Sequence, residues 1–384
     1  MSNEVMEARL RSLIEMNSEA NRAKPAMEWK RQGKKVIGVL TPYVPEEVIS
    51  AAGMLPWRIS GTWRSSVPKA LVYRPPHTCQ FSTHVLESLL SGELDFLDGV
   101  VANNYDDDRR RVWDVWVHLG KTPFAHIMHL PFVDTGQARE WFVGSINKLI
   151  KDLEDHYGVK ISPESLRRAI DVQNKTRTLL RGIYELRKRE IPPLSGSEFL
   201  GITTAASIMP REEFNREIEA LSEYIEQRQT SLKKTRPRLL VASDALDNPA
   251  YLELIENAGC LVAMDDFDTG SRYIWKTVQV DHDDPVQALA RDYLVRPACP
   301  RMFYWADRQM EQVIAWVREF DIGGVLNFVQ IYGYPRWLAA PYLSERLMKA
   351  GIPNMTLLHE YHVSNQAQLK TRITAFLETL KSES

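Results

Sequence analysis

The stretch KKVIGVLTPYVPEEVISAAGM, residues 34 to 54, decides the fold. Its apolar start (34–40) predicts a buried strand, and residues 46–54 predict a helix, because Pro45 stands just before it, where a proline fits well. A strand, a tight polar turn and a helix make a βα unit. Two interpretations stay open: the unit closes a core, or its turn, with Glu46 and Glu47, lines a binding crevice.

The same alternation continues through the first third of the chain. Further strands are expected at 55–60, 97–103 and 123–131, and further helices at 80–93 and 106–120. Strands that alternate with helices in this way predict a parallel sheet with helices on its faces.

The pattern then changes twice. Residues 137–235 are almost wholly helical in pattern, and the strand–helix alternation restarts at residue 236. The predicted class is α/β, with two parallel-sheet domains, an N-terminal helix and a helical insert. The expected boundaries are 1–30 for the N-terminal helix, 31–136 for the first α/β domain, 137–235 for the helical insert and 236–384 for the second α/β domain.

A basic run lies inside the helical insert. Residues 166–190 contain eight lysines and arginines against three acids. A solvated helix face explains most such runs. Contact with the anionic groups of a ligand or partner is the alternative.

The bulk composition is that of a globular protein. Hydrophobic residues make up 44% and charged residues 26%, and the net charge is −2. These values do not suggest a nucleic-acid partner, and no apolar run approaches the length needed to cross a bilayer. The charged N-terminus lacks a signal-peptide core, so a soluble cytoplasmic protein is expected.

The three cysteines, Cys79, Cys260 and Cys299, do not form a disulfide framework or a CxxC pair. Their spacing alone predicts no metal site. Cys260 opens an apolar strand, and we expect it to be a buried core thiol.

Ligands of open α/β sheets bind beyond the carboxyl ends of the strands. Here those ends are polar, acidic and aromatic, without the glycine-rich loops that hold dinucleotides or phosphates. They are TPYVPEE (41–47), GTWRS (61–65), NNYDDD (103–108), SDALDN (243–248), DDFDTG (265–270), QIYGYPRW (330–337) and HEYHVSN (359–365).

Several longer stretches form a series with a known likeness. In chain order they are YVPEEVISAAGMLPWRI, HTCQFSTHVLESLLSGELDFLDGVV, NPAYLELIENAGCLVAMDDFDTGSRY, YLVRPACPRM, IGGVLNFVQIYGYPRWLAAPYLSERLMKAGIP and QAQLKTRITAFLETL. In order and spacing, the series resembles the 2-hydroxyacyl-CoA dehydratase and benzoyl-CoA reductase family, over roughly residues 30 to 380.

The resemblance implies an assembly as well as a fold. Subunits of this family have two flavodoxin-like or Rossmann-like domains, with a 4Fe-4S cluster held between them by three cysteines. They work with a homologous cluster-bearing subunit, an ATP-hydrolysing activator that donates electrons, and an acyl-CoA or aryl-CoA substrate. This chain would be the smaller, gamma-type subunit of an ATP-dependent benzoyl-CoA reductase, or else a subunit of a 2-hydroxyacyl-CoA dehydratase.

The cysteine positions of the family are only partly filled here. Cys79 matches the first, Tyr105-Asp106 stands at the second, and Gly333 falls at the third. The resemblance therefore makes Cys79 the one cluster ligand, in an incomplete set, and implies that the cluster sits in the partner subunit. Cys299 is a further family-like position that the sequence does not place beside Cys79.

The remaining positions suggest a different use of the crevice. We expect Glu46 to stabilise its helix dipole. We expect Glu47, Tyr105 and Asp106 to form a polar wall in which a carboxylate donates or relays a proton. Two rival hypotheses stay open: a non-catalytic subunit that binds acyl-CoA or stabilises a partner, and a stand-alone two-domain binding protein.

Overall fold

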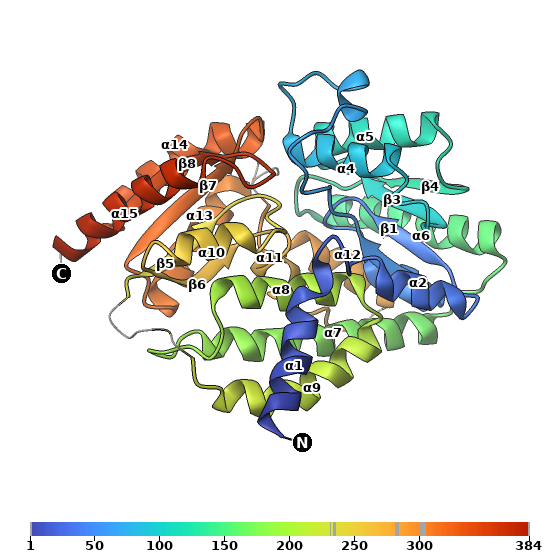
Figure 1. Ribbon diagram of the computed structural model, residues 1–384. Helices are drawn as coiled ribbons and strands as arrows, with labels where there is room; N and C mark the ends of the chain where they lie inside the picture. Colours follow the sequence, from blue (N-terminus) through green and yellow to red (C-terminus); the bar gives the residue numbers. More distant parts are fainter. Residues whose placement is uncertain (1, 231, 233–235, 281–283, 300–304, 383–384) are drawn as a thin grey trace.

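The computed structural model describes residues 2–230, 232, 236–280, 284–299 and 305–382. Two parallel sheets lie side by side, with a layer of helices beneath both of them (Figure 1). The predicted α/β class with two parallel-sheet domains is confirmed. Within the described residues, no helix has the length and apolar character needed to cross a membrane.

The first sheet has the strand order β2-β1-β3-β4, with every neighbouring pair parallel. Its strands are β1 (Val36–Val39), β2 (Leu55–Arg58), β3 (Gly99–Asn103) and β4 (Phe124–Met128). All residues of β1 and β3 are buried, as expected for central strands that are covered on both faces. Helices α3 (Glu46–Ala51), α4 (Gln80–Leu90) and α5 (Asp107–His118) connect the strands.

The second sheet repeats this topology with the order β6-β5-β7-β8, again fully parallel. Its strands are β5 (Arg238–Ala242), β6 (Leu261–Asp266), β7 (Gly324–Gln330) and β8 (Asn354–His359). Helices α10 (Ala250–Glu256), α13 (Ala306–Glu319), α14 (Tyr334–Lys349) and α15 (Gln366–Ser382) complete this half.

The helical insert contains α6 (Gly136–Tyr157), α7 (Pro163–Leu186), α8 (Gly196–Ile208) and α9 (Arg211–Gln227). Helix α8 is central, since all of its residues except Glu198 are buried and it contacts β2 of one half and β6 of the other. A helix that is apolar on all sides belongs inside a protein. Its start is fixed by a capping box between Ser195 and Glu198.

Two expectations about helices were wrong. The single helix expected over 1–30 is two helices, α1 (Asn3–Ile14) and α2 (Lys24–Arg31), separated by a 3-10 turn, and Pro25 lies in the first turn of α2. The segment after β6, where no helix was expected, contains α11 (Ser271–Ile274) and α12 (Pro285–Leu294). Helix α12 packs on α6, which also contacts β4. Because these contacts cross the expected domain boundaries, the boundaries stay a prediction.

Candidate active site between the two sheets

The loops at the carboxyl ends of the two sheets meet each other. Arg58 at the end of β2 donates from Nη1 to the backbone carbonyl of Asp268 at 3.1 Å. Cys79 Sγ donates to Gln330 Oε1 at the end of β7, at 3.5 Å. In each sheet the strand order reverses beside the central strand, and such switch points are where open α/β sheets bind ligands. The two switch points thus share one interdomain region.

Cys79 is fully buried at the start of α4, where it occupies the N-cap position. The side chain of Gln330 reaches it from the other domain. Gln330 Oε1 also accepts the backbone N–H of Phe81 at 3.1 Å, so one amide group ties the first turn of α4 to β7.

Tyr105 and Asp106 are buried at the junction of β3 and α5. Asp106 caps α5, because its Oδ1 accepts the N–H of Asp108 at 2.9 Å. Its other carboxylate oxygen faces Arg109, with 3.9 Å between Oδ2 and Nε. The Arg109 guanidinium carbon lies 4.4 Å from the centre of the Phe81 ring and 5.4 Å from that of Tyr105.

Arg109 also faces the second domain. Its Nη2 is 3.5 Å from Asp268 Oδ2, and Asp268 in turn accepts from Nε of Arg272 at 3.0 Å. Burial would lower the pKa of Arg272, but Asp266 and Asp268 raise that pKa well above its usual value. We call Asp106, Arg109, Asp268 and Arg272 the interdomain cluster. Asp106 was predicted from the sequence as a site residue, and Asp268 belongs to the acidic strand end DDFDTG. Arg109 and Arg272 were not predicted.

Glu46 is buried at the start of α3 and has three partners. It is 2.7 Å from Nε of Arg58 and 2.7 Å from Nη2 of Arg211, and Tyr273 donates its hydroxyl at 2.9 Å. Burial alone would raise the pKa of Glu46, but Arg58 and Arg211 outweigh it and lower the pKa to about 2. Glu46 therefore ties α3 to β2 and to the helical insert, a role that its sequence position did not reveal.

Glu47 makes a matching contact with α7. Its carboxylate is 2.7 Å from Nη2 of Arg177, and both side chains are 0% exposed. Tyr293 donates its hydroxyl to the other oxygen of Glu47 at 2.5 Å. The first turn of α3 thus carries two carboxylates that hold the insert in place. A proton-transfer role for Glu47 stays a prediction.

The basic run of α7 has a use that neither interpretation foresaw. Arg177 and Arg187 are both buried. Arg177 pairs with Glu47, and Arg187 Nη1 lies 3.2 Å from Asp265 Oδ2 at the end of β6. These two arginines join the insert to both halves of the molecule.

Two tyrosines at the strand ends have strained backbones. Tyr43 after β1 has a φ of 65° and Tyr332 after β7 a φ of 63°, in the left-handed region that non-glycine residues rarely adopt. The Tyr43 hydroxyl accepts the N–H of Cys299 at 3.0 Å, and its ring centre lies 6.2 Å from that of Tyr105. Tyr43 thus contacts both Cys299 and Tyr105. The stretch YLVRPACPRM, which contains Cys299, ends outside the described residues.

The residues present do not fit a 4Fe-4S cluster. Such clusters are held by thiolates, and the three family positions here offer one thiol, one phenol and a glycine. The cavity lined by Phe81, Arg109, Ala245 and Asp268 has a volume of about 30 Å³, which is room for about one water molecule. In the part of the chain that the structure describes, no group of three or more His, Cys, Asp and Glu side chains is arranged to hold a metal ion.

Comparison with known proteins gives concordant matches. The family model described as 2-hydroxyglutaryl-CoA dehydratase, D-component, matches residues 41–380. The (R)-phenyllactyl-CoA dehydratase beta subunit of Clostridium sporogenes is 25% identical over 91% of this chain and 93% of its own length. A benzoyl-CoA reductase subunit of Thauera aromatica is 24% identical over 93% of this chain and 94% of its own length.

A third relative, the (R)-2-hydroxyglutaryl-CoA dehydratase beta subunit of Acidaminococcus fermentans, is 25% identical over 92% of this chain and 94% of its own length. These relatives are similar to the chain to nearly the same degree, so the comparison does not separate ring reduction from dehydration. The match from residue 41 to residue 380 shows that the chain belongs to the 2-hydroxyacyl-CoA dehydratase and benzoyl-CoA reductase family.

Proposed function

We propose that this chain is a catalytic-core subunit of an ATP-dependent aryl-CoA reductase of the benzoyl-CoA reductase type, and that it supports a cluster-bearing homologue. The observation that carries the proposal is the interdomain cluster, which fills the space between the switch points with paired charges. A chain built in this way contributes a polar wall and a partner surface, while electron transfer belongs to the homologue and its ATP-hydrolysing activator.

The polar wall would act on the thioester of the acyl-CoA or on charge that develops beside it. Preorganised charges in a region closed to water stabilise such charge strongly. Asp106 is the better candidate for proton transfer, because its Oδ2 is 3.9 Å from Arg109, a longer contact than the 2.7 Å between Glu47 and Arg177. Tyr105 stacks against the same guanidinium. The contacts of Glu47 with Arg177 and Tyr293 support an anchoring role instead.

A 2-hydroxyacyl-CoA dehydratase subunit is the second candidate, favoured by the dehydratase names of two of the three relatives and of the family model. The test is reconstitution. The chain is coexpressed with a homologue that carries all three cysteines, purified without oxygen and supplied with the activator, ATP and an excess of a low-potential reductant such as dithionite.

Benzoyl-CoA and (R)-2-hydroxyglutaryl-CoA are then assayed for a cyclic diene product and for loss of water. Diene formation supports the reductase, and water loss supports the dehydratase. Full turnover by the homologue without this chain would contradict both.

A further inference from the structure

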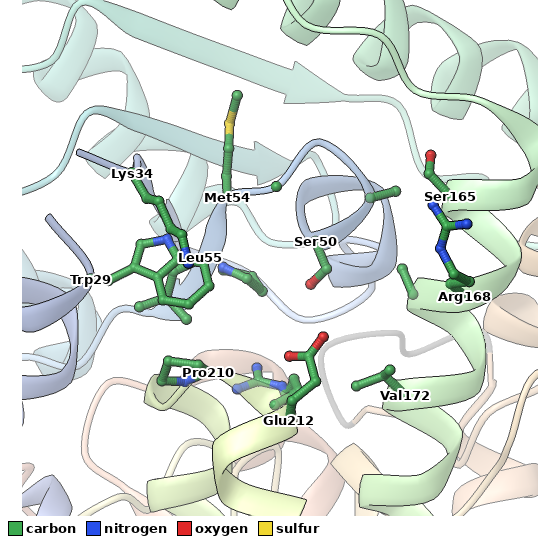
Figure 2. Close-up of a pocket in the computed structure, with 15 residues that line it drawn as sticks. Trp29, Lys34, Ser50, Met54, Leu55, Ser165, Arg168, Val172, Pro210 and Glu212 are labelled. Atoms are coloured by element: carbon green, nitrogen blue, oxygen red, sulfur yellow. The ribbon is translucent and has the colours of Figure 1, made fainter. Parts of the chain in front are cut away.

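A second site lies at the other end of α3, away from Glu46 and Glu47. Here the N-terminal part of the chain, the start of β2 and the helical insert enclose a cavity of about 370 Å³ (Figure 2). Cavities of this size hold small organic ligands. None of the residues predicted from the sequence as site residues lines it.

The inside of this cavity is mainly apolar. Its lining includes Met54, Leu55 and Pro56 around the start of β2, with Val172 of α7 and Pro210 before α9. Trp29 forms one wall, and the ammonium of Lys34 lies over its ring, 3.8 Å from the ring centre. The body of a ligand would therefore be apolar, and the indole favours a flat one.

The polar groups of the cavity have a definite arrangement. Lys34 and Arg168 stand on opposite sides of the cavity, while Ser50 and Glu212 point toward each other across its middle (Figure 2). Lys34, Arg168 and Glu212 are all exposed, and no ion pair of theirs is present among the described residues. Two cations and one acid therefore remain available to a ligand.

Arg211 also lines the cavity, but its charge is paired with that of Glu46. Its Nη2 pairs with Glu46 at 2.7 Å and its Nε donates to Gln173 at 2.9 Å. The lining side chains thus offer a net charge of +1, with an acid at the centre. That balance suits a monoanion that brings its own hydrogen-bond donor, and it disfavours a phosphate dianion.

We propose that this cavity binds a small organic carboxylate with a flat apolar body and a hydroxyl or ammonium group beside the carboxylate. Arg168 holds the carboxylate, because the Lys34 ammonium already lies over the Trp29 ring. Glu212 and Ser50 take the neighbouring donor, and Trp29 packs against the apolar body. The proposal is independent of the function proposed above, since it concerns different residues and a binding event without chemistry.

Calorimetric titration of the full chain with 3-phenyllactate tests it, because this probe has all three features. Two matched probes each lack one: 3-phenylpropionate has no hydroxyl and 2-phenylethanol has no carboxylate. We expect 3-phenyllactate to bind, 3-phenylpropionate to bind less tightly, and 2-phenylethanol to bind at least about tenfold more weakly, since a hydrogen bond to a charged group contributes that much.

Variants locate the site. Arg168→Gln and Glu212→Gln should each weaken 3-phenyllactate binding roughly tenfold. The controls Arg110→Gln, at an exposed arginine of α5, and Glu213→Gln, beside Glu212 in the same helical turn, should leave the affinity unchanged. All four positions are on the surface, so urea unfolding should confirm that each variant folds.

Three results would overturn the proposal. One is no heat from any probe up to millimolar concentrations. Another is equal affinity for 2-phenylethanol and 3-phenyllactate, which would mean that the cavity binds the apolar body and does not recognise the carboxylate. The third is affinity that survives both Arg168→Gln and Glu212→Gln, which would place the carboxylate elsewhere.

Discussion

At the scale of single residues, Glu46 shows how a charged side chain can be accommodated in a protein interior. Its partners Arg58, Arg211 and Tyr273 satisfy both oxygens inside the protein. Removing one member of such a network leaves the others charged and buried, which costs far more than the intact network contributes.

Glu46→Gln should lower the free energy of unfolding by about 3 kcal/mol at neutral pH. The pKa of Glu46 is about 2 in the folded protein against 4.5 ordinarily. Because the folded pKa is the lower one, this stability is present above about pH 4.5 and is lost as the pH falls toward 2. Urea unfolding across that range should show a smaller acid loss in the variant. Glu213→Gln, exposed on α9, should change stability by less than about 0.5 kcal/mol, and an equal effect of both changes would refute the argument.

Cys79 allows a direct test of the cluster argument. We expect the chain purified without oxygen to contain well under four irons and four acid-labile sulfides, and Cys79→Ser to leave both values unchanged. The physical reason is the donor set: one thiol beside a glutamine amide does not replace three thiolates. Four irons per chain that disappear in Cys79→Ser would show that Cys299 or another ligand completes a cluster.

At the scale of elements, the start of α5 combines two roles that can be separated. Asp106 both caps the helix and faces Arg109. An asparagine keeps the cap but removes the charge, whereas an alanine removes both.

Asp106→Asn should therefore retain most of the stability while lowering turnover of the assembled complex, and Asp106→Ala should lose about 1 kcal/mol more of unfolding free energy. Tyr105→Phe tests the phenol in the same assay, and Glu47→Gln tests the remaining predicted site residue. Urea unfolding and substrate turnover are measured on each variant. Full turnover in Asp106→Asn and Tyr105→Phe within an intact complex would make this region structural only.

The elements also show what the sequence could and could not reveal. The strands and most helices were predictable, because short apolar runs and amphipathic periods are local signals. Helix α12, in contrast, was not predicted from the sequence. The partners of Glu47 were not predictable, since Arg177 lies 130 residues away and Tyr293 lies 246 residues away. Local patterns do not contain such pairings, and for the same reason the interdomain cluster was found only in part.

At the scale of the whole molecule, the two halves are joined at the crevice by contacts from several loops. His77 Nδ1 lies 2.9 Å from the Tyr332 hydroxyl, and the Tyr334 hydroxyl donates to the His77 carbonyl at 3.2 Å. Around this junction the start of α14 exposes large apolar side chains: Tyr334 is 44%, Trp337 38% and Leu338 74% exposed. A group of exposed aromatic and aliphatic side chains is typical of a protein interface.

We therefore expect this surface to contact the homologous subunit, and the chain alone to be poorly soluble. Leu338→Asp should weaken complex formation at least roughly tenfold, because it places a charge in an apolar contact. Met348→Asp provides a matched control, since Met348 is 63% exposed near the other end of the same helix. Coexpressed subunits are compared by size-exclusion chromatography with light scattering. A stable, monodisperse monomer of the wild-type chain, or equal assembly of the two variants, would place the partner elsewhere or remove the need for one.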